Sequence, residues 1–344
     1  MKLNEIGEFA LIERLGTRLK TRSKVLLGIG DDGAILDSLH CPVITCDALM
    51  ESVHFRRDWT SARDLGWKAV AVNVSDLAAM GADPVAIVLA LGLPADLQIA
   101  WLEELYEGLE EAAAHYDLSI VGGDTTRAAG GVFLAVTAIG EVPANRLPLR
   151  RDGARPGDIV LVTGTLGDAA AALQLLLQPD SMAALNLADC EFLLSRHHRP
   201  QARLKAMRAA QNATIKYFQA TKIGGVTAAL DLSDGTAGDA AHLARRSGVT
   251  IEIEIVRLPL SDASRAAAEI LNQSAEEWAL RGGEDYELLL CVAPDDVETM
   301  IEAIEKSGVS ATRIGVCVPL QEAPVVLLHP DGRREIAAKA WTHF

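Results

Sequence analysis

The chain has 344 residues, of which 49% are hydrophobic and 23% are charged, and its formal net charge is −15 at pH 7. This length exceeds what one ordinary compact core accommodates, so two domains are expected, and the composition is that of a folded globular protein. The acidic balance argues against nucleic-acid binding, because a phosphate backbone needs a basic surface. Any phosphate-binding function must therefore depend on local cations.

The sequence shows no sign of secretion or of a membrane span. Met1–Gly16 mixes charged with apolar residues, unlike a signal peptide. The most apolar run, Pro84–Pro94, is shorter than the roughly 20 residues that a membrane-spanning helix needs. The 5 cysteines form no CxxC pair, which favours reduced thiols over disulfides or a zinc site. We expect a cytoplasmic protein whose partners include no membrane and no nucleic acid.

The first half of the chain alternates short apolar runs with helical patterns. Two helices are predicted, one from the N-cap Ser61 to Met80 and one over Leu97–Tyr116. Asn145–Gly157 is rich in Arg, Gly and Pro and is interpreted as the domain joint. Strands are predicted at Val25–Ile29, Val43–Cys46, Val85–Leu91, Ser119–Val121 and Val132–Val142.

A second α/β pattern begins at Asp158. Helices are predicted at Asp168–Leu177, Thr236–Ser247 and Pro294–Lys306. Gln211–Gly225 is polar and poorly periodic, and we interpret it as a connecting excursion. Strands are predicted at Ile159–Val162, Thr250–Val256, Glu287–Val292, Thr312–Val316 and Val325–Leu328.

Aspartates recur at strand ends, in glycine turns and inside otherwise apolar helices. One such aspartate is more often a turn or cap residue, but the recurrence favours a shared role. Mg²⁺ takes oxygen ligands, usually a few carboxylates with water and substrate phosphates, whereas converging carboxylates without metal repel one another. The set is therefore interpreted as a magnesium cluster that receives a polyphosphate: Asp31, Asp32, Asp47, Asp76, Asp124, Asp231 and Asp234.

Three further features suit phosphate binding, each with a structural alternative. Gly122–Thr126 is interpreted as a loop where backbone N–H groups approach phosphate, or as a tight turn. Thr163–Asp168 opens a helix whose N-terminus suits an anion, or is a plain strand-to-helix turn. Arg151 either reaches phosphate from the joint or is a surface arginine.

Several familiar signatures are absent. The sequence has no GxxxxGK[ST], no HRD…DFG set, no GxSxG elbow and no HExxH. It is therefore neither a P-loop kinase nor a protein kinase. His197 and His198 are adjacent, so their side chains point apart on a helix, and we interpret both as structural.

Short motifs follow one another along the chain in a fixed order: GIGDD, TCD, VHF, NVSDLAAMGADP, VGGDTTR, RDGARPGD, GTLGD, RHHRP, DLSDG, GGEDYEL and WTHF. The order of these motifs resembles that of the thiamine-monophosphate kinase family, over essentially the whole chain. The Asp and Gly motifs are shared with the wider aminoimidazole-ribonucleotide-synthetase superfamily, whereas GGEDYEL and the WTHF end are specific to the kinases.

The resemblance implies an α/β (α+β) fold of two domains, similar to aminoimidazole-ribonucleotide synthetase. It also implies a homodimer in which the N-terminal domains pair into an intersubunit β-barrel. Residues 1–148 would then form the domain that binds ATP and Mg²⁺ and dimerises. Residues 149–344 would form an α/β domain that closes the active site.

Carried over residue by residue, the resemblance implies several Mg²⁺ ions, ATP as co-substrate and thiamine monophosphate as acceptor. The implied metal ligands are Asp32, Thr45, Cys46, Asp47, Asp76, Asp124, Asp231 and Asp234. The implied nucleotide contacts are Tyr106, Gly123, Asp124, Arg151 and Ser233. The implied substrate contacts are His54, Glu284 and Trp341. Thiamine carries a cationic thiazolium and an aminopyrimidine, which an aromatic face and a carboxylate suit.

The chain departs from the family pattern at Cys46, where the family usually has Thr. The change is harmless if this position binds metal through its carbonyl, whereas a hydroxyl ligand would be lost. A second departure is Gln211–Gly225, which is longer than in relatives.

The expected reaction is a direct in-line transfer from ATP to the phosphate of thiamine monophosphate. That phosphate is already ionised at neutral pH, so no general base is needed and no catalytic residue is nominated. The alternative is another ATP-using enzyme of the superfamily, such as a selenophosphate synthetase or a purine cycloligase. The former expects a reactive cysteine on an N-terminal loop, and none precedes Cys41. A catalytically idle nucleotide-binding protein would have lost acidic positions, which are intact.

Overall fold

The computed structural model describes residues 2, 5, 14–29, 33–218 and 225–337. The chain divides into two compact units. The N-terminal unit comprises Met1–Leu77 and Ala82–Ala144, and the C-terminal unit comprises Ala78–Gly81 and Asn145–Phe344. In the described part of the chain, no helix combines the length and the apolar character needed to span a membrane.

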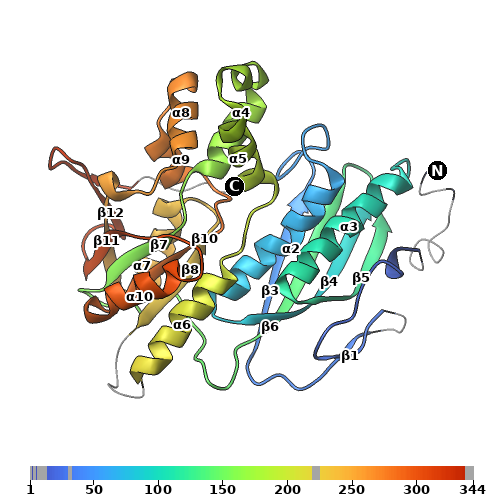
Figure 1. Cartoon of the computed structure of the whole chain (residues 1–344), viewed down its shortest axis with the longest axis horizontal. Helices are drawn as coiled ribbons and strands as arrows, with labels where there is room; N and C mark the ends of the chain where they lie inside the picture. The colour runs from blue at the N-terminus through green and yellow to red at the C-terminus, as the bar shows by residue number, and fades with distance from the viewer. Residues whose placement is uncertain (1, 3–4, 6–13, 30–32, 219–224, 338–344) are drawn as a thin grey trace. The chain divides into compact units, whose positions relative to one another are not determined.

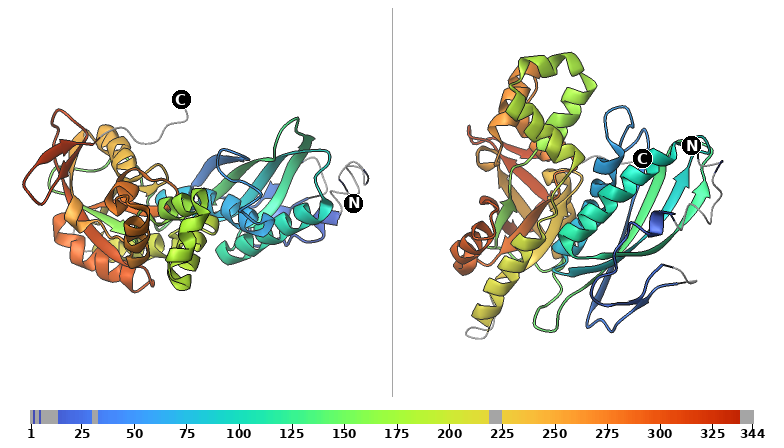
Figure 2. Two further views of the ribbon diagram at one scale, coloured as in Figure 1. Left: turned by 90° about the horizontal axis from the view of Figure 1, so that it is seen from above. Right: turned by 45° about the vertical axis from the view of Figure 1, so that its right-hand side comes forward.

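The N-terminal unit is a four-stranded sheet in the order β3-β6-β4-β5, with β4 and β5 parallel and the other neighbours antiparallel. Helices α2 and α3 lie on the same face of this sheet (Figure 1; Figure 2, left). A two-stranded sheet of β1 and β2 precedes it. The elements are β1 Val25–Leu27, β2 Ile35–Leu36, β3 Pro42–Met50, α2 Ala62–Ala79, β4 Asp83–Leu93, α3 Ile99–Tyr116, β5 Ser119–Arg127 and β6 Phe133–Glu141.

Strand alternation separates a covered face from an open face of the N-terminal sheet. On the covered face, Leu49, Leu89 and Val136 are each at most 5% exposed. On the open face, Ile44 is 67% and Met50 is 47% exposed, although the β1–β2 hairpin packs on one end of this face. An apolar sheet face of this kind is stable in water when a further partner covers it.

The C-terminal unit is a seven-stranded mixed sheet in the order β13-β12-β9-β11-β7-β10-β8. Its apolar core has α7 and α9 on one face and α6 and α10 on the other. Helices α4, α5, α8 and α9 enclose a third, smaller cluster. The strands are β7 Ile159–Thr163, β8 Val226–Leu232, β9 Val249–Glu254, β10 Glu287–Val292, β11 Ala311–Pro319, β12 Val325–Leu328 and β13 Arg334–Ile336. The helices are α4 Asp168–Leu177, η2 Pro179–Ala184, α5 Leu187–His198, α6 Leu204–Phe218, α7 Thr236–Ser247, η3 Ile255–Arg257, α8 Asp262–Leu271, α9 Ala275–Arg281, η4 Pro294–Asp296 and α10 Val297–Glu305.

Two interpretations of the sequence are wrong. Gln211–Gly225 is not a connecting excursion along its whole length, because helix α6 continues to Phe218. Gln211 is buried in this helix and donates a hydrogen bond to the carbonyl of Leu147, so a polar side chain is tolerated there. Gly122–Thr126 is not a loop, since β5 runs through it to Arg127.

Candidate functional site

Helix α2 packs on strand β3 in the N-terminal unit and brings three predicted metal ligands together. Thr45 and Asp47 lie two residues apart on the covered face of the strand. Asn73 and Asp76 lie three residues apart on one side of the helix. Thr45 Oγ1 donates a hydrogen bond to Asp76 Oδ2, and Asp47 N donates to Asn73 Oδ1 at 3.1 Å. Sequence reasoning missed Asn73, although it stands in the NVSD motif.

Cys46 lies on the open face of β3, opposite Thr45 and Asp47, and is exposed. Its thiol therefore does not join Asp76 on the covered face. A cysteine in place of the usual threonine leaves the Thr45–Asp76 hydrogen bond unchanged.

Gly123 and Asp124 lie on β5, at the opposite edge of the sheet from Asp47. Because neighbouring strands are about 4.8 Å apart, β3 and β5 are separated by about 14 Å. Two oxygen ligands of one Mg²⁺, each about 2.1 Å from the ion, are no more than about 4 Å apart. The exposed Asp124 thus does not meet Asp47 within one sheet. Gly123 has a structural reason to be glycine, because a Cβ there would lie 2.1 Å from the carbonyl of Leu89.

The turn after β3 fixes the ring of His54. The ring Nδ1 accepts a hydrogen bond from Met50 N at 3.1 Å. The backbone N–H of His54 donates to the Met50 carbonyl at 2.9 Å. A neutral imidazole that accepts at Nδ1 carries its proton at Nε2, so Nε2 is a donor. On α3, Tyr106 is half-buried, and burial raises the pKa of its hydroxyl to about 12.

The DLSDG turn of the C-terminal unit joins β8 to α7 and carries Ser233 and Asp234. Asp239, in the first turn of α7, accepts hydrogen bonds from the backbone N–H groups of Ser233 at 2.9 Å and Asp234 at 3.0 Å. Burial raises the pKa of Asp239 to about 7, although these two N–H groups and the positive charge of Arg151 oppose the shift. Sequence reasoning missed Asp239, whose only signal was an acidic residue in the first turn of a helix.

Two further predicted residues flank this turn. Asp231 lies on the edge strand β8 and is 4% exposed, on the same face as Ala229, which packs in the cluster of α6 and α10. Arg151 is exposed, and its carbonyl accepts a hydrogen bond from Ser247 Oγ at 2.8 Å. Its positive charge opposes the rise in the pKa of Asp239, which holds the DLSDG turn.

The segment before β10 carries Glu284 and is bonded to the same turn. Glu284 N donates to the Ser233 carbonyl at 2.8 Å. The structure therefore brings together the predicted nucleotide contact Ser233, the predicted metal ligand Asp234 and the predicted substrate contact Glu284. Three other predicted residues, Asp31, Asp32 and Trp341, lie outside the described residues.

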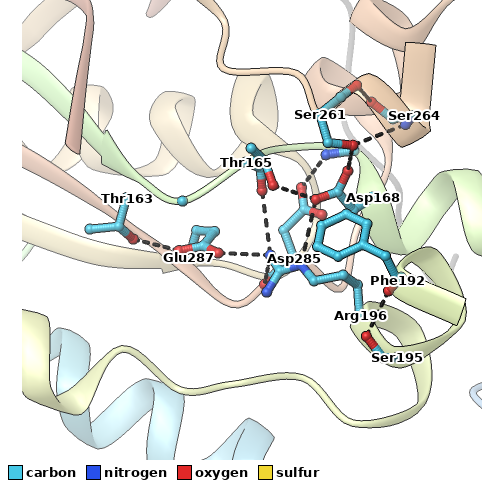
Figure 3. A network of polar contacts seen from close by, with 12 residues as sticks. Thr163, Thr165, Asp168, Phe192, Ser195, Arg196, Ser261, Ser264, Asp285 and Glu287 are labelled. Atoms are coloured by element: carbon cyan, nitrogen blue, oxygen red, sulfur yellow. Dashed lines mark hydrogen bonds and ion pairs between the residues drawn. The ribbon is translucent and has the colours of Figure 1, made fainter. Parts of the chain in front are cut away.

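A buried polar network supports this segment (Figure 3). Glu287 is 0% exposed and accepts hydrogen bonds from Arg196 Nη2 at 2.7 Å, from Arg203 Nε at 2.6 Å and from Thr163 Oγ1 at 2.6 Å. Burial tends to lower the pKa of the Arg196 guanidinium, but the nearby carboxylates Glu287 and Asp168 prevail and raise it. Sequence reasoning missed this network, which joins the RHHRP, GTLGD and GGEDYEL motifs.

Asp285 is the third acidic side chain of the network, beside Glu287 and Asp168. Burial raises the pKa of its carboxyl to about 8, while Gly167 N–H, which donates to Oδ2 at 2.8 Å, acts in the opposite direction. Two arginines and two carboxylates already balance, so a protonated Asp285 leaves the network neutral. Because Asp285 occupies the N-terminus of α4, the Thr163–Asp168 segment serves as a strand-to-helix turn.

Two sets of oxygen atoms suit Mg²⁺ as ligands, because they belong to carboxylates and a hydroxyl. One set comes from Thr45, Asp47 and Asp76, and the other from Asp231 and Asp234. Within the described ranges, no three His, Cys, Asp or Glu side chains converge as a complete cation site. The residues therefore fit an ion that takes its remaining ligands from substrate phosphates and water, as Mg²⁺ commonly does.

Known proteins share this sequence and fold. Residues 30–142 match the family AIR synthase related protein, N-terminal domain, and residues 155–326 match its C-terminal domain. The chain is 40% identical to the thiamine-monophosphate kinase of Escherichia coli K12 over 312 residues, 90% of each protein. It is 41% identical to the solved thiamine-monophosphate kinase of Stenotrophomonas maltophilia K279a, with a TM-score of 0.78 over 96% of this chain and 98% of that one. It is 33% identical to AaThiL complexed with AMPPCP and TMP, with a TM-score of 0.72 over 100% and 99% of the two chains.

The raised pKa of Asp285 makes the stability of the protein depend on pH. The folded state keeps a proton that the unfolded chain releases above the ordinary value of 3.8, so this contribution to stability is full below about pH 4 and is lost as pH rises through about 8. Asp285→Asn is neutral at every pH. Urea unfolding should show that the free energy of unfolding of the wild type falls relative to that of the variant by up to about 1.4 kcal/mol per pH unit across this window. If the free energy of unfolding depended on pH in the same way in both proteins, Asp285 would not carry the proposed proton.

Proposed function

The chain belongs to the thiamine-monophosphate kinase family, and from this premise we propose that it transfers the γ-phosphoryl group of ATP to thiamine monophosphate. The products are thiamine diphosphate and ADP. The observation that carries this proposal is the 33% identity over the whole chain to AaThiL complexed with AMPPCP, an ATP analogue, and TMP. The DLSDG turn and Glu284, which lie in contact, support it.

The reaction is a direct in-line displacement. A phosphate oxygen of thiamine monophosphate forms a bond to the γ-phosphorus as the bond to the β–γ bridging oxygen breaks, and ADP leaves with that electron pair. The attacking phosphate is largely ionised at pH 7, since its second pKa is about 6. The chain therefore needs to bind, orient and neutralise rather than to remove a proton.

The chain's oxygen groups would hold several Mg²⁺ ions. Thr45, Asp47 and Asp76 form one group, Asp231 and Asp234 form another, and Asp32, the carbonyl of Cys46 and Asp124 complete the proposed set. When bound, Mg²⁺ neutralises charge on the phosphates. Thr45 holds the Asp76 carboxylate through its hydroxyl, and Asp239 holds the backbone of the DLSDG turn.

Substrate recognition is assigned to His54, Glu284 and Trp341. His54 presents Nε2–H, which suits a phosphate oxygen. The carboxylate of Glu284 suits the cationic thiazolium, and the indole of Trp341 offers it an aromatic face. The proposed nucleotide contacts are Tyr106, Gly123, Asp124, Arg151 and Ser233.

ATP binding, metal binding and dimerisation are assigned to the N-terminal domain, residues 1–148, and closure of the active site to residues 149–344. The five cysteines are free thiols, which supports a reducing cytoplasm as the place of the reaction.

A homodimer would cover the open face of the N-terminal sheet. Among the described residues, the exposed large hydrophobic residues between positions 26 and 53 are Leu26, Leu27, Ile29, Ile35, Ile44, Met50 and Val53. Two such four-stranded sheets facing each other across a twofold axis would close into an eight-stranded barrel between the subunits.

The position of Asp124 explains why catalysis would require a dimer. Asp124 lies about 14 Å from β3 within one sheet, yet closing the barrel brings the β5 edge of one copy beside the β3 edge of the other. We therefore assign Asp124 to the active site of the second copy, which it approaches from the open face of the sheet, whereas Asp47 and Asp76 lie on the covered face.

The function is tested by incubating the purified protein with ATP, Mg²⁺ and thiamine monophosphate and by separating the products. Thiamine diphosphate should form, and bare thiamine should give none. Asp47→Asn and Asp76→Asn should each lower kcat by at least about 100-fold, as is typical when transition-state charge loses a stabiliser. The exposed Asp96→Asn is the matched control and should retain activity. Near-normal turnover in both variants would remove the metal assignment.

Ile44→Asp should convert the dimer into monomers, because it places a charge on the open apolar face. Analytical ultracentrifugation measures the change in mass. Val256→Asp, at a residue 71% exposed in the C-terminal unit, is the control and should leave the dimer intact. A dimeric Ile44→Asp protein would move the interface elsewhere.

Mixed dimers test whether Asp124 acts on the second copy. Coexpressed Asp124→Asn and Asp47→Asn chains should regain about a quarter of wild-type activity, since half of the dimers are mixed and each of these has one complete site. The control pair, Asp47→Asn with Asp76→Asn, damages the same group in both chains and should regain none. Equal results for the two pairs would place Asp124 in its own chain's site.

A further inference from the structure

The loop from Gly282 to Tyr286, between α9 and β10, has an unusual backbone. Glu284 has φ of 71° and Tyr286 has φ of 50°, both in the left-handed region. Residues other than glycine adopt this conformation at a cost in free energy, and it persists only where the surroundings fix it. The loop is therefore held in one shape by its neighbours.

Backbone contacts to the DLSDG turn fix one side of the loop. Tyr286 N donates to the Leu232 carbonyl at 2.8 Å, next to the bond from Glu284 N to Ser233. A Cβ on Gly283 would lie 2.4 Å from the Ser233 carbonyl, so the two backbones are in direct contact. The loop cannot shift without moving the turn.

The last turn of α5 fixes the other side. Arg196 Nη2 lies 3.5 Å from the Asp285 carbonyl. It also donates to Glu287, the first residue of β10, directly after the loop. The next residue, His197, is 4% exposed, and its Nδ1 lies 3.2 Å from Glu284 Oε2. The Glu284 side chain is 25% exposed, so one end of its carboxylate is held inside while part of it faces solvent.

We propose that His197 is a positioning residue for thiamine monophosphate, which it serves by orienting the carboxylate of Glu284. This inference rests on the proposed function, in which Glu284 contacts the substrate. A neutral imidazole whose Nδ1 lies 3.2 Å from Oε2 orients the carboxylate and leaves its negative charge for the thiazolium. A carboxylate already held in place loses less side-chain entropy when the substrate binds, so its contribution to affinity is larger.

Two amide variants separate orientation from packing. The amide nitrogen of His197→Asn lies near the position of Nδ1, whereas that of His197→Gln lies near Nε2. His197→Gln should raise the KM for thiamine monophosphate about ten-fold, as expected for loss of a buried polar contact to a charged group, and should leave the KM for ATP within about two-fold. His197→Asn should recover most of the loss. The exposed Glu191→Gln, on the same helix, is the control and should match the wild type.

A double-mutant cycle with Glu284→Gln completes the test. If His197 acts through Glu284, the double variant should bind thiamine monophosphate no worse than Glu284→Gln alone. Additive effects, equal effects on both substrates, or equal losses in His197→Asn and His197→Gln would overturn the inference and leave His197 as a packing residue. An unchanged KM in Glu284→Gln itself would instead overturn the substrate role of Glu284 under the proposed function.

Discussion

The carboxylate of Glu287 is the interaction on which the C-terminal unit depends. It is the first residue of β10, and it is bonded to side chains from β7, from α5 and from the segment before α6. Removing one partner of such a buried pair typically costs about 3–5 kcal/mol, because the other charge is left uncompensated. The residues directly before it form the loop of Glu284, so the ion network also fixes where that loop leaves the sheet.

In the N-terminal unit, the alternation of side chains along a strand, and not a buried ion network, positions the candidate ligands. Thr45 and Asp47 face α2 because alternate residues of a strand share a face, and Cys46 therefore faces the other way. The same rule leaves Ile44 and Met50 on the open side. A single strand thus supplies both the oxygen ligands and the apolar surface proposed to hold a second copy.

Local signals in the sequence were enough to predict many elements. The helices at Asp168–Leu177 and Thr236–Ser247 and the strands at Glu287–Val292 and Val325–Leu328 are confirmed with the expected bounds. Contacts between distant segments gave no such signal. Glu103, Glu107 and Glu110 resemble a solvated acidic face of α3, yet they bind Arg14, Arg18 and Arg22. His197 was interpreted as structural because it is adjacent to His198 on a helix, and nothing near it in the sequence indicates its contact with Glu284, 87 positions away.

Some carboxylates are bound by charged arginines and others lie against uncharged groups. Which of the two a carboxylate has corresponds to its proposed role. Arg196 and Arg203 bind Glu287, which belongs to the scaffold, and their charges balance those of Glu287 and Asp168. The Thr45 hydroxyl binds Asp76, and the His197 imidazole lies against Glu284. A hydroxyl or a neutral imidazole orients a carboxylate without cancelling its charge, and that charge is what attracts a metal ion or a thiazolium. In a chain with a net charge of −15, the 32 basic residues cannot neutralise all 47 acidic ones, so basic side chains pair with particular carboxylates and leave others charged. These pairs are formed by the buried arginines of the network and by the N-terminal arginines that bind glutamates of α3, namely Arg14, Arg18 and Arg22.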